Sequence, residues 1–367
     1  MPLSRALGCA SLCSLLTLSA GQVPVEPAAP VNTNTTLPHI FFVLVDDLGW
    51  ADVGFNRDVP TPEVATPTLD AIVAEGVHLR RHYVHLMCTP TRTSVQSGRL
   101  PVHVSTSLAN PEKPNCGIPR NMTGMAAVMK KANYKTHLVG KWDAGMATPH
   151  HTPKGRGYDT SLHYFEHKND YWTMKAAQTS CTNTWDLWDT DRPAYELAGS
   201  AYEEFLFRDR LLSIVEEHDA TDPLMLFYAP HVAHCPLQVP ESYLARFAAM
   251  TNGTDEQTCS VQTASINPQN SSFACRAQYA AMVAVLDDNI KNVTDALKAK
   301  GMWDNTLMIF SSDNGGPIDV EENAANNYPL RGGKYSEFEG GVYVVSCLTR
   351  ILGASAFQTN AVVFIFP

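Results

Sequence analysis

The chain has 367 residues, 44% of them hydrophobic and 17% charged, and its formal net charge at pH 7 is -10. These proportions are ordinary for a globular protein and exclude a chain that is disordered throughout. The acidic balance argues against a nucleic-acid binder, which would present a basic face. It does not argue against a small anionic ligand, because a few converging cations can bind one in a cleft of an acidic protein.

Residues 1–21 have the pattern of a secretory signal peptide, with a basic start and an apolar run at 6–20 that is too short to span a bilayer. Residues 22–37, rich in Pro, Ala, Thr and Asn, are predicted to be a flexible lead-in. No later stretch is long and apolar enough for a membrane span. We therefore expect a protein of the secretory pathway, either secreted or in a lysosomal or vacuolar lumen. Asn-x-Ser/Thr sequons fit this expectation and lie at Asn34, Asn121, Asn252, Asn270 and Asn292.

Strand and helix patterns alternate along the rest of the chain. Continuous apolar runs, typical of strands covered on both faces, predict strands at residues 40–45, 224–229 and 307–310, and a short strand is predicted at 135–139. Helices are predicted at residues 67–75, 92–97, 123–132, 200–218 and 278–300. The first helix lies between Thr66 as N-cap and Gly76 as stop, and the last ends at Gly301. This alternation predicts an α/β fold with a doubly wound, mostly parallel sheet and helices on both faces.

Polar residues follow the predicted strands where each strand ends. They are Asp46 and Asp47 after the first, Lys141 after the second, His231 and His234 after the third, and Asp313 and Asn314 after the last. Ligands of open α/β sheets bind at the carboxyl ends of the strands, so we expect these residues to share one site. Their carboxylate and amide oxygens are the ligands that hard cations such as Ca²⁺ or Mg²⁺ prefer. Either acidic turn alone would more often be a loop, but two of them, each after an apolar strand, favour a metal site.

Residues 88–99 read CTPTRTSVQSGR, which is Cys-x-Pro-x-Arg with Gly-Arg six and seven residues past the arginine. Taken alone, this could be an ordinary turn entering a helix, since a lone cysteine is more often a small buried hydrophobe than a nucleophile. The motif nevertheless resembles the signature of the type I, formylglycine-dependent sulfatases. In that family the cysteine is oxidised to formylglycine (3-oxoalanine), whose hydrate attacks the sulfur of a sulfate ester. A geminal diol can accept sulfate on one oxygen and expel it by collapsing through the other, which serine or cysteine cannot do.

The resemblance covers roughly residues 38–345. The segments GMWDNTLMIFSSDNGG and NNYPLRGGKYSEFEGGV are similar to the arylsulfatase B (N-acetylgalactosamine-4-sulfatase) branch. This implies an alkaline-phosphatase-like α/β fold, hydrolysis of sulfate esters of small molecules or glycans, and maturation by a formylglycine-generating enzyme. Residues 346–367 match nothing recognisable, and the smaller C-terminal antiparallel subdomain of the family is expected to be missing, as in a truncated form.

The resemblance also implies roles for single residues. Cys88, as formylglycine hydrate, is the expected nucleophile, and Arg92 supports it. Ca²⁺ is expected to bind Asp46, Asp47, Asp313 and Asn314 together with the converted Cys88. Lys141 and Lys334 are expected to hold the sulfate. His234, which precedes a PLQVP segment, is expected to contact the substrate and protonate the leaving oxygen, with His231 as a weaker candidate.

One site position departs from the family pattern. The family usually reads Gly-Lys-Trp-His-x-Gly, whereas this chain has Asp143 in place of the histidine. That histidine normally contacts the formylglycine hydroxyl and helps it to expel sulfate. An aspartate could still accept the proton, but its charge would lower the affinity for an anionic substrate or favour a different one.

The cysteine count fits conversion of Cys88. The nine cysteines include two in the predicted signal, which leaves an odd seven in the mature chain. Conversion of Cys88 leaves an even six, which are Cys116, Cys181, Cys235, Cys259, Cys275 and Cys347. Cys259 and Cys275 flank a polar insert and are the best candidates for a disulfide.

Two other functions stay open. One is a phosphoester or phosphonate hydrolase of the same superfamily, since phosphate and sulfate differ in charge more than in shape. The other is a truncated, non-catalytic sulfatase-like protein that binds glycans. Assays with a sulfate ester and a phosphomonoester separate the first alternative from a sulfatase, and thermal melting with and without Ca²⁺ tests the second.

Overall fold

The computed structural model describes residues 37–107, 113, 117–176, 183–250, 273–318 and 324–349. All of them belong to one unit, Thr36–Pro367. Among the helices in these ranges, none is both long and apolar enough to cross a membrane. The predicted signal peptide, the lead-in up to residue 36, and Asn34, Asn252 and Asn270 lie outside the described residues, while the sequons at Asn121 and Asn292 are exposed.

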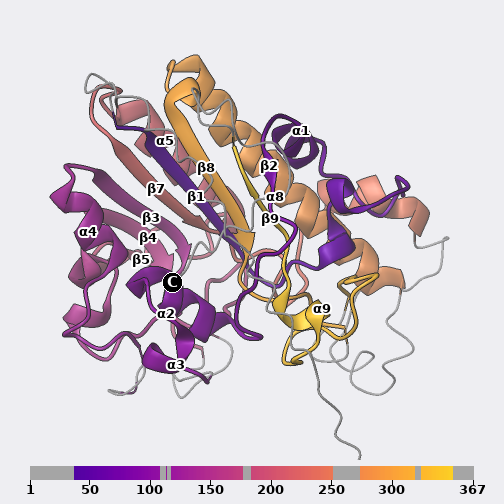
Figure 1. Cartoon of the computed structure of the whole chain (residues 1–367), viewed down its shortest axis with the longest axis horizontal. Helices are drawn as coiled ribbons and strands as arrows, with labels where there is room; N and C mark the ends of the chain where they lie inside the picture. The colour runs from indigo at the N-terminus through magenta and orange to yellow at the C-terminus, as the bar shows by residue number, and fades with distance from the viewer. Residues whose placement is uncertain are drawn as a thin grey trace, which may run out of the picture. The chain divides into compact units, whose positions relative to one another are not determined.

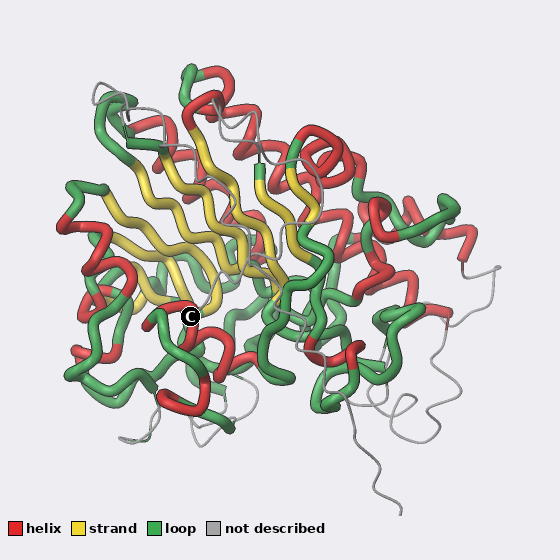
Figure 2. The backbone as a smooth tube through the Cα atoms, viewed as in Figure 1, coloured by secondary structure: helices red, strands yellow, loops and turns green. Residues whose placement is uncertain are grey.

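A nine-stranded sheet in the described residues forms the centre of the fold, with the order β2-β9-β8-β1-β7-β3-β4-β5-β6. The five strands from β8 to β4 are parallel, and the short strands at both edges pair antiparallel. Figure 2 shows the strands in yellow between red helices. The strands are β1 His39–Val45, β2 Val77–His78, β3 Lys135–Lys141, β4 Thr160–Tyr164, β5 Trp188–Asp189, β6 Arg192–Pro193, β7 Leu224–Ala229, β8 Thr306–Ser312 and β9 Ser346–Leu348.

Helices cover both faces of this sheet because side chains of a buried strand alternate between two cores. Phe41, Val43 and Val45 of β1 pack with α1, α5 and α8, whereas Phe42 and Leu44 pack with α2 and α4. The α-helices are α1 Pro67–Glu75, α2 Cys88–Ser97, α3 Pro101–Val104, α4 Met125–Lys131, α5 Glu203–Glu217, α6 Glu241–Leu244, α8 Phe273–Ala299 and α9 Glu339–Val342. The 3₁₀ turns are η1 Trp50–Asp52, η2 Gly54–Asn56, η3 Pro149–His151, η4 Lys154–Arg156, η5 Ala245–Met250 and η6 Trp303–Asn305.

The predicted doubly wound, mostly parallel sheet is confirmed, with differences at the element ends. Helix α2 begins at Cys88, four residues before the predicted start, because proline at position 90 is tolerated in the first turn of a helix. Strand β3 continues to Lys141 because Gly140 adopts a φ of 107° and stays paired with Ala229. The short edge strands were not predicted, since two or three residues carry too little pattern. The segment predicted to diverge begins with one of them, β9.

The even count of six cysteines does not mean that all six form disulfides. Cys235 and Cys347 are thiols in the structure rather than disulfide-bonded. Cys347 is buried in β9 and Cys235 in the loop after β7, where a cysteine serves as a small hydrophobe. Cys275 is disulfide-bonded, and its predicted partner Cys259 lies outside the described residues, as do Cys116 and Cys181.

Candidate active site

The parallel strands bring the polar residues that follow them to one edge of the sheet. Strand β1 pairs in parallel with β7 and β8, and β7 pairs in parallel with β3, so the carboxyl ends of the four strands lie together. Figure 1 shows α2 at this end of the sheet, the end toward which the strand arrows point. The predicted site residues are buried there, with exposed fractions of 2% or less: Asp46, Asp47, Cys88, Arg92, Lys141, Asp143, His234, Asp313, Asn314 and Lys334.

Oxygen atoms that could bind a metal ion lie around the cysteine of the signature motif. One ligand atom each from Asp46, Asp47, Cys88 and His234 lies within 4.8 Å of the others. The Cys88 thiol donates to Asp46 Oδ1 at 3.3 Å. Asn314 Nδ2 donates to Asp47 Oδ1 at 2.7 Å, while Asn314 Oδ1 is buried with no hydrogen-bond partner in the described residues. A buried amide oxygen without a donor beside carboxylates fits a hard cation, so these residues could hold Ca²⁺.

Arg92 and the two lysines balance the charge of these carboxylates. The Arg92 guanidinium contacts Asp313 Oδ2 through Nε at 2.9 Å and Nη2 at 2.8 Å, and lies 3.6 Å from Asp46. Lys141 Nζ donates to Asp46 at 2.6 Å, and Lys334 Nζ donates to Asp47 at 2.9 Å. Buried charges at such distances depend on one another, since removal of one partner leaves the other uncompensated.

This network shifts the pKa values of the buried groups. Burial alone would raise the pKa of Asp46, but Lys141, His234, Arg92 and Lys334 hold it well below its usual range. Burial and the Asp46 charge raise the pKa of Asp313 to about 7. Burial, with the charges of Asp313 and Asp46, raises the pKa of the Cys88 thiol well above its usual value. The unconverted Cys88 is therefore a neutral thiol, a weak nucleophile, at neutral pH.

His234 lies in the site and His231 lies behind it. Nε2 of His234 is 3.1 Å from Lys334 Nζ and 3.6 Å from Asp47 Oδ2, and its Nδ1 donates to the Cys235 carbonyl at 2.7 Å. His231 instead bonds Glu203 at 2.9 Å through Nδ1, and its ring stacks on Tyr171 at 3.9 Å.

The loop that carries both histidines is fixed from the first turn of α5. Glu204 accepts hydrogen bonds from the backbone amides of His231 and Val232, at 2.6 and 3.1 Å. Burial raises the pKa of Glu204 to about 7. Glu203 and Glu204 therefore support the shape of the site without entering it. Sequence patterns do not reveal this role, because acidic residues are common at the start of a helix.

The structure places Asp143 beside the site but pairs it with a residue that was not predicted. Thr89 Oγ1 donates to Asp143 Oδ1 at 2.9 Å, and His167 Nδ1 lies 3.0 Å from the same oxygen. Lys141 Nζ is 3.9 Å from Asp143 Oδ2. His167 follows β4, a strand that sequence patterns did not reveal, so its position at the site could not be anticipated.

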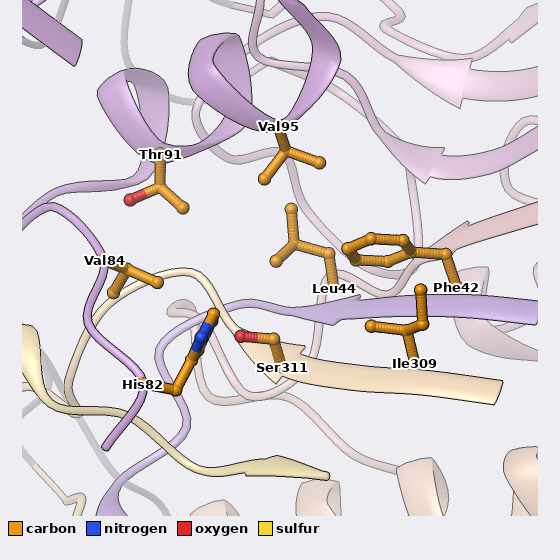
Figure 3. A pocket seen from close by; sticks show the side chains of 8 residues that line it. All are labelled: Phe42, Leu44, His82, Val84, Thr91, Val95, Ile309 and Ser311. Atoms are coloured by element: carbon orange, nitrogen blue, oxygen red, sulfur yellow. The ribbon is translucent and has the colours of Figure 1, made fainter. Parts of the chain in front are cut away.

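A pocket under α2 is not part of this site. Figure 3 shows Thr91 and Val95 of α2 pointing toward Phe42 and Leu44 of β1, with Ile309 and Ser311 of β8 beside them. Its lining is mainly apolar, and burial lowers the pKa of His82, which also lines it, to about 4. The pocket belongs to the packing that holds α2, and thus Cys88, against the sheet.

Comparisons with known proteins agree on one family. The family profile described as Sulfatase matches residues 38–346. The chain is similar to arylsulfatase J of Mus musculus, with 35% identity over 326 residues that cover 88% of this chain and 50% of that protein. It is also similar to N-acetylgalactosamine-6-sulfatase of Homo sapiens, with 26% identity over 83% of this chain and 55% of that protein. The chain thus spans about half the length of these curated relatives.

Solved structures share the fold. The crystal structure of Ps i-CgsB in complex with k-i-k-neocarrahexaose superposes with a TM-score of 0.71 and 27% identity, covering 85% of this chain and 66% of that one. The phosphonate monoester hydrolase of Agrobacterium radiobacter superposes with a TM-score of 0.54 at 17% identity, covering 85% of this chain and 68% of that one. The second similarity supports the fold alone.

Proposed function

Because the chain belongs to the sulfatase family, we propose that it hydrolyses sulfate esters at the site formed by Cys88 and the residues around it. The observation that carries this proposal is the position of Cys88 in the first turn of α2, within 4.8 Å of the ligand atoms of Asp46, Asp47 and His234. A cysteine so placed, once converted to formylglycine, would present its hydrate to bound Ca²⁺ and to substrate. The converted residue supplies an oxygen nucleophile, and Ca²⁺ supplies positive charge near the sulfate.

The residues of the chain itself provide the remaining functions. Lys141 and Lys334 contact Asp46 and Asp47 on two sides of the cluster, and we propose that they hold sulfate oxygens between them. Arg92, fully buried and bonded to Asp313, fixes the orientation of the carboxylates rather than touching substrate. His234 faces this space through Nε2, the atom that would carry the proton for the leaving alcohol oxygen.

The substrate and the setting are also proposals. The arylsulfatase B-like motifs and the relative named N-acetylgalactosamine-6-sulfatase favour a sulfated glycan or a small aryl sulfate as substrate. The signal-like start of the chain and the sequons favour the secretory pathway, where a formylglycine-generating enzyme would meet Cys88.

The test is made on the full chain expressed through a eukaryotic secretory route with an active formylglycine-generating enzyme. We expect the tryptic peptide with Cys88 to lose about 18 Da, the difference between a thiol and an aldehyde side chain. We expect turnover of 4-nitrocatechol sulfate to exceed that of a phosphomonoester. Cys88→Ser should abolish turnover, whereas Cys347→Ala, which changes a buried cysteine of β9 that is not among the proposed site residues, should retain it. An unmodified Cys88, or a preference for the phosphomonoester, would contradict the proposal.

A further inference from the structure

A carboxylate and an imidazole form a buried pair beside the nucleophile helix. Asp143 is 1% exposed, and its Oδ1 lies 3.0 Å from Nδ1 of His167, whose side chain is 13% exposed. Burial would raise the pKa of Asp143, but His167 lowers it; burial would lower the pKa of His167, but Asp143 raises it. The nearby Asp143 carboxylate favours the tautomer of neutral His167 that carries its proton on Nδ1, so above the raised pKa of His167 its Nε2 is left as a proton acceptor.

The sheet brings these two residues together. Strands β3 and β4 are parallel neighbours, and Lys141 at the end of β3 lies opposite Tyr164 at the end of β4. Asp143 lies two residues past the first strand and His167 three residues past the second, so both reach the carboxyl edge where the site is built. The pairing is thus fixed by strand register and does not depend on a long loop.

The pair is tied to the reacting region on two sides. Thr89, next to Cys88 in α2, donates its hydroxyl to Asp143 at 2.9 Å. Lys141, which also bonds Asp46, lies 3.9 Å from the other carboxylate oxygen. The next residue of the His167 loop, Lys168, donates to Cys235 Sγ at 3.1 Å, beside His234. The loop therefore borders the site on the side of β3, whereas His234 enters from the loop after β7.

We propose that Asp143 and His167 act as one carboxylate–imidazole pair and form the second proton-transfer group of the site, in place of a histidine at position 143. This rests on the proposed sulfatase function. Asp143 is the positioning residue, and His167 takes the proton that must leave when sulfate is released. In that step an O–H bond of the nucleophilic centre breaks and its proton moves to the imidazole. The oxygen left behind forms a carbonyl, and the carbon–oxygen bond to sulfate breaks with its electron pair leaving on sulfate.

Two half-reactions make the assignment testable. Release of the alcohol needs a proton donor, the role proposed for His234, and release of sulfate needs a proton acceptor. If His167 serves only the second, His167→Gln should retain a burst of about one equivalent of 4-nitrocatechol and then turn over ~100-fold or more slowly, with KM falling alongside kcat so that kcat/KM changes little. A matched swap, Asp143→His with His167→Ser, returns the imidazole to position 143 and should recover turnover.

The pH dependence of kcat provides a second test, because a purely structural role of the Asp143–His167 pair would not change it. The charged groups that face His167 are Asp143, Lys141 from β3 and Glu166 from its own loop. Since Asp143 raises the pKa of His167, Asp143→Asn should shift the acid limb of kcat to lower pH. NMR titration of labelled histidines should show the same displacement in the absence of substrate. This second variant keeps the test valid if His167→Gln does not fold.

The outcomes separate this inference from the proposed function. No sulfatase turnover by the unmodified sequence with converted Cys88 would refute the function itself. If the parent is active, two results would overturn the assignment of His167 alone. One is a turnover rate of His167→Gln within threefold of the parent's rate, and the other is a His167→Gln variant that loses both the burst and turnover. An unchanged acid limb and unchanged NMR titration in Asp143→Asn would do the same.

Discussion

Single residues in this protein are held by charge partners as much as by packing. Arg92 is fully buried, and its planar guanidinium meets Asp313 through two nitrogens while reaching Asp46. A lysine could supply the charge, but it lacks the planar group that donates to Asp313 through Nε while Nη2 lies near both Asp313 and Asp46. Asp143 shows the same dependence. It is a buried aspartate where the family usually has a histidine, so its negative charge needs a partner, and His167 Nδ1 lies 3.0 Å from it.

A residue outside the site should make the protein sensitive to acid. His163 of β4 is fully buried, and both of its ring nitrogens are without hydrogen-bond partners in the described residues. Burial lowers its pKa to about 3, with Asp189 opposing the shift. Because the folded-state pKa lies below the unfolded value of about 6.5, the stabilisation that neutral His163 provides is complete above pH 6.5 and is lost as the pH falls toward 3.

We expect His163→Leu to remove this loss. Relative to the parent, the unfolding free energy of the variant should rise by about 2 kcal/mol between pH 7.5 and pH 5, since one pKa unit corresponds to about 1.4 kcal/mol. Urea denaturation at a series of pH values measures it. A difference between variant and parent that stays constant with pH would contradict the assignment of the acid sensitivity to His163.

At the scale of elements, the close approach of β3 and β7 positions Lys141. Gly140 has a φ of 107°, and a Cβ atom added there would lie 1.9 Å from the Ala229 carbonyl oxygen. Gly98, at the end of α2, also has a positive φ of 65°, but a Cβ atom there would meet nothing within 4 Å. Both glycines therefore adopt a positive φ that other residues rarely adopt, but only Gly98 has room for a side chain.

This difference predicts unequal effects of the same substitution. Gly98→Ala should cost about 1 kcal/mol from the left-handed backbone alone and leave activity intact. Gly140→Ala should cost at least about 3 kcal/mol or prevent folding, because the two strands must separate next to the site. Chemical denaturation compares them, and equal stabilities of the two variants would show that β3 and β7 can separate at little cost.

At the scale of the whole molecule, the cation site joins elements that are far apart in sequence. Asp46 and Asp47 follow β1, and Asp313 and Asn314 follow β8, so the donors come together only in the folded chain. A ligand that binds only the folded state stabilises it, by about 2.7 kcal/mol at a concentration 100 times its Kd. Ca²⁺ is therefore expected to stabilise the whole fold rather than one loop.

We expect saturating Ca²⁺ to raise the melting temperature by about 5 °C or more, as a few kcal/mol does for a domain of this size. Asn314→Ala, which removes the unpartnered amide oxygen, should abolish most of the rise. Asn292→Gln, an exposed change on α8, should preserve it. Differential scanning calorimetry with EDTA and with added Ca²⁺ makes the measurement. A Ca²⁺-induced rise of equal size in Asn314→Ala would remove Asn314 from the ligand set.

Much of this protein follows from local sequence patterns. The apolar runs of β1, β7 and β8 are long enough to predict buried parallel strands, and the residues after them could be assigned to one edge because parallel strands share a direction. The roles expected of the motif from Cys88 to Arg99 and of Lys141, His234 and Lys334 follow from the resemblance of their segments to the sulfatase family.

Other features depend on contacts between distant segments and carry no local signal. The two-residue edge strands exist only because a neighbouring strand is there to pair with them, and Glu204 supports the His231 amide across 27 positions of the chain. The partner of Asp143 is likewise set by the register of β3 and β4. The sequence by itself determined the fold class and, through the family resemblance, most residues of the candidate site, but not His167. Only the tertiary structure decided which charges meet, because burial and pairing are properties of packed neighbours rather than of spacing along the chain.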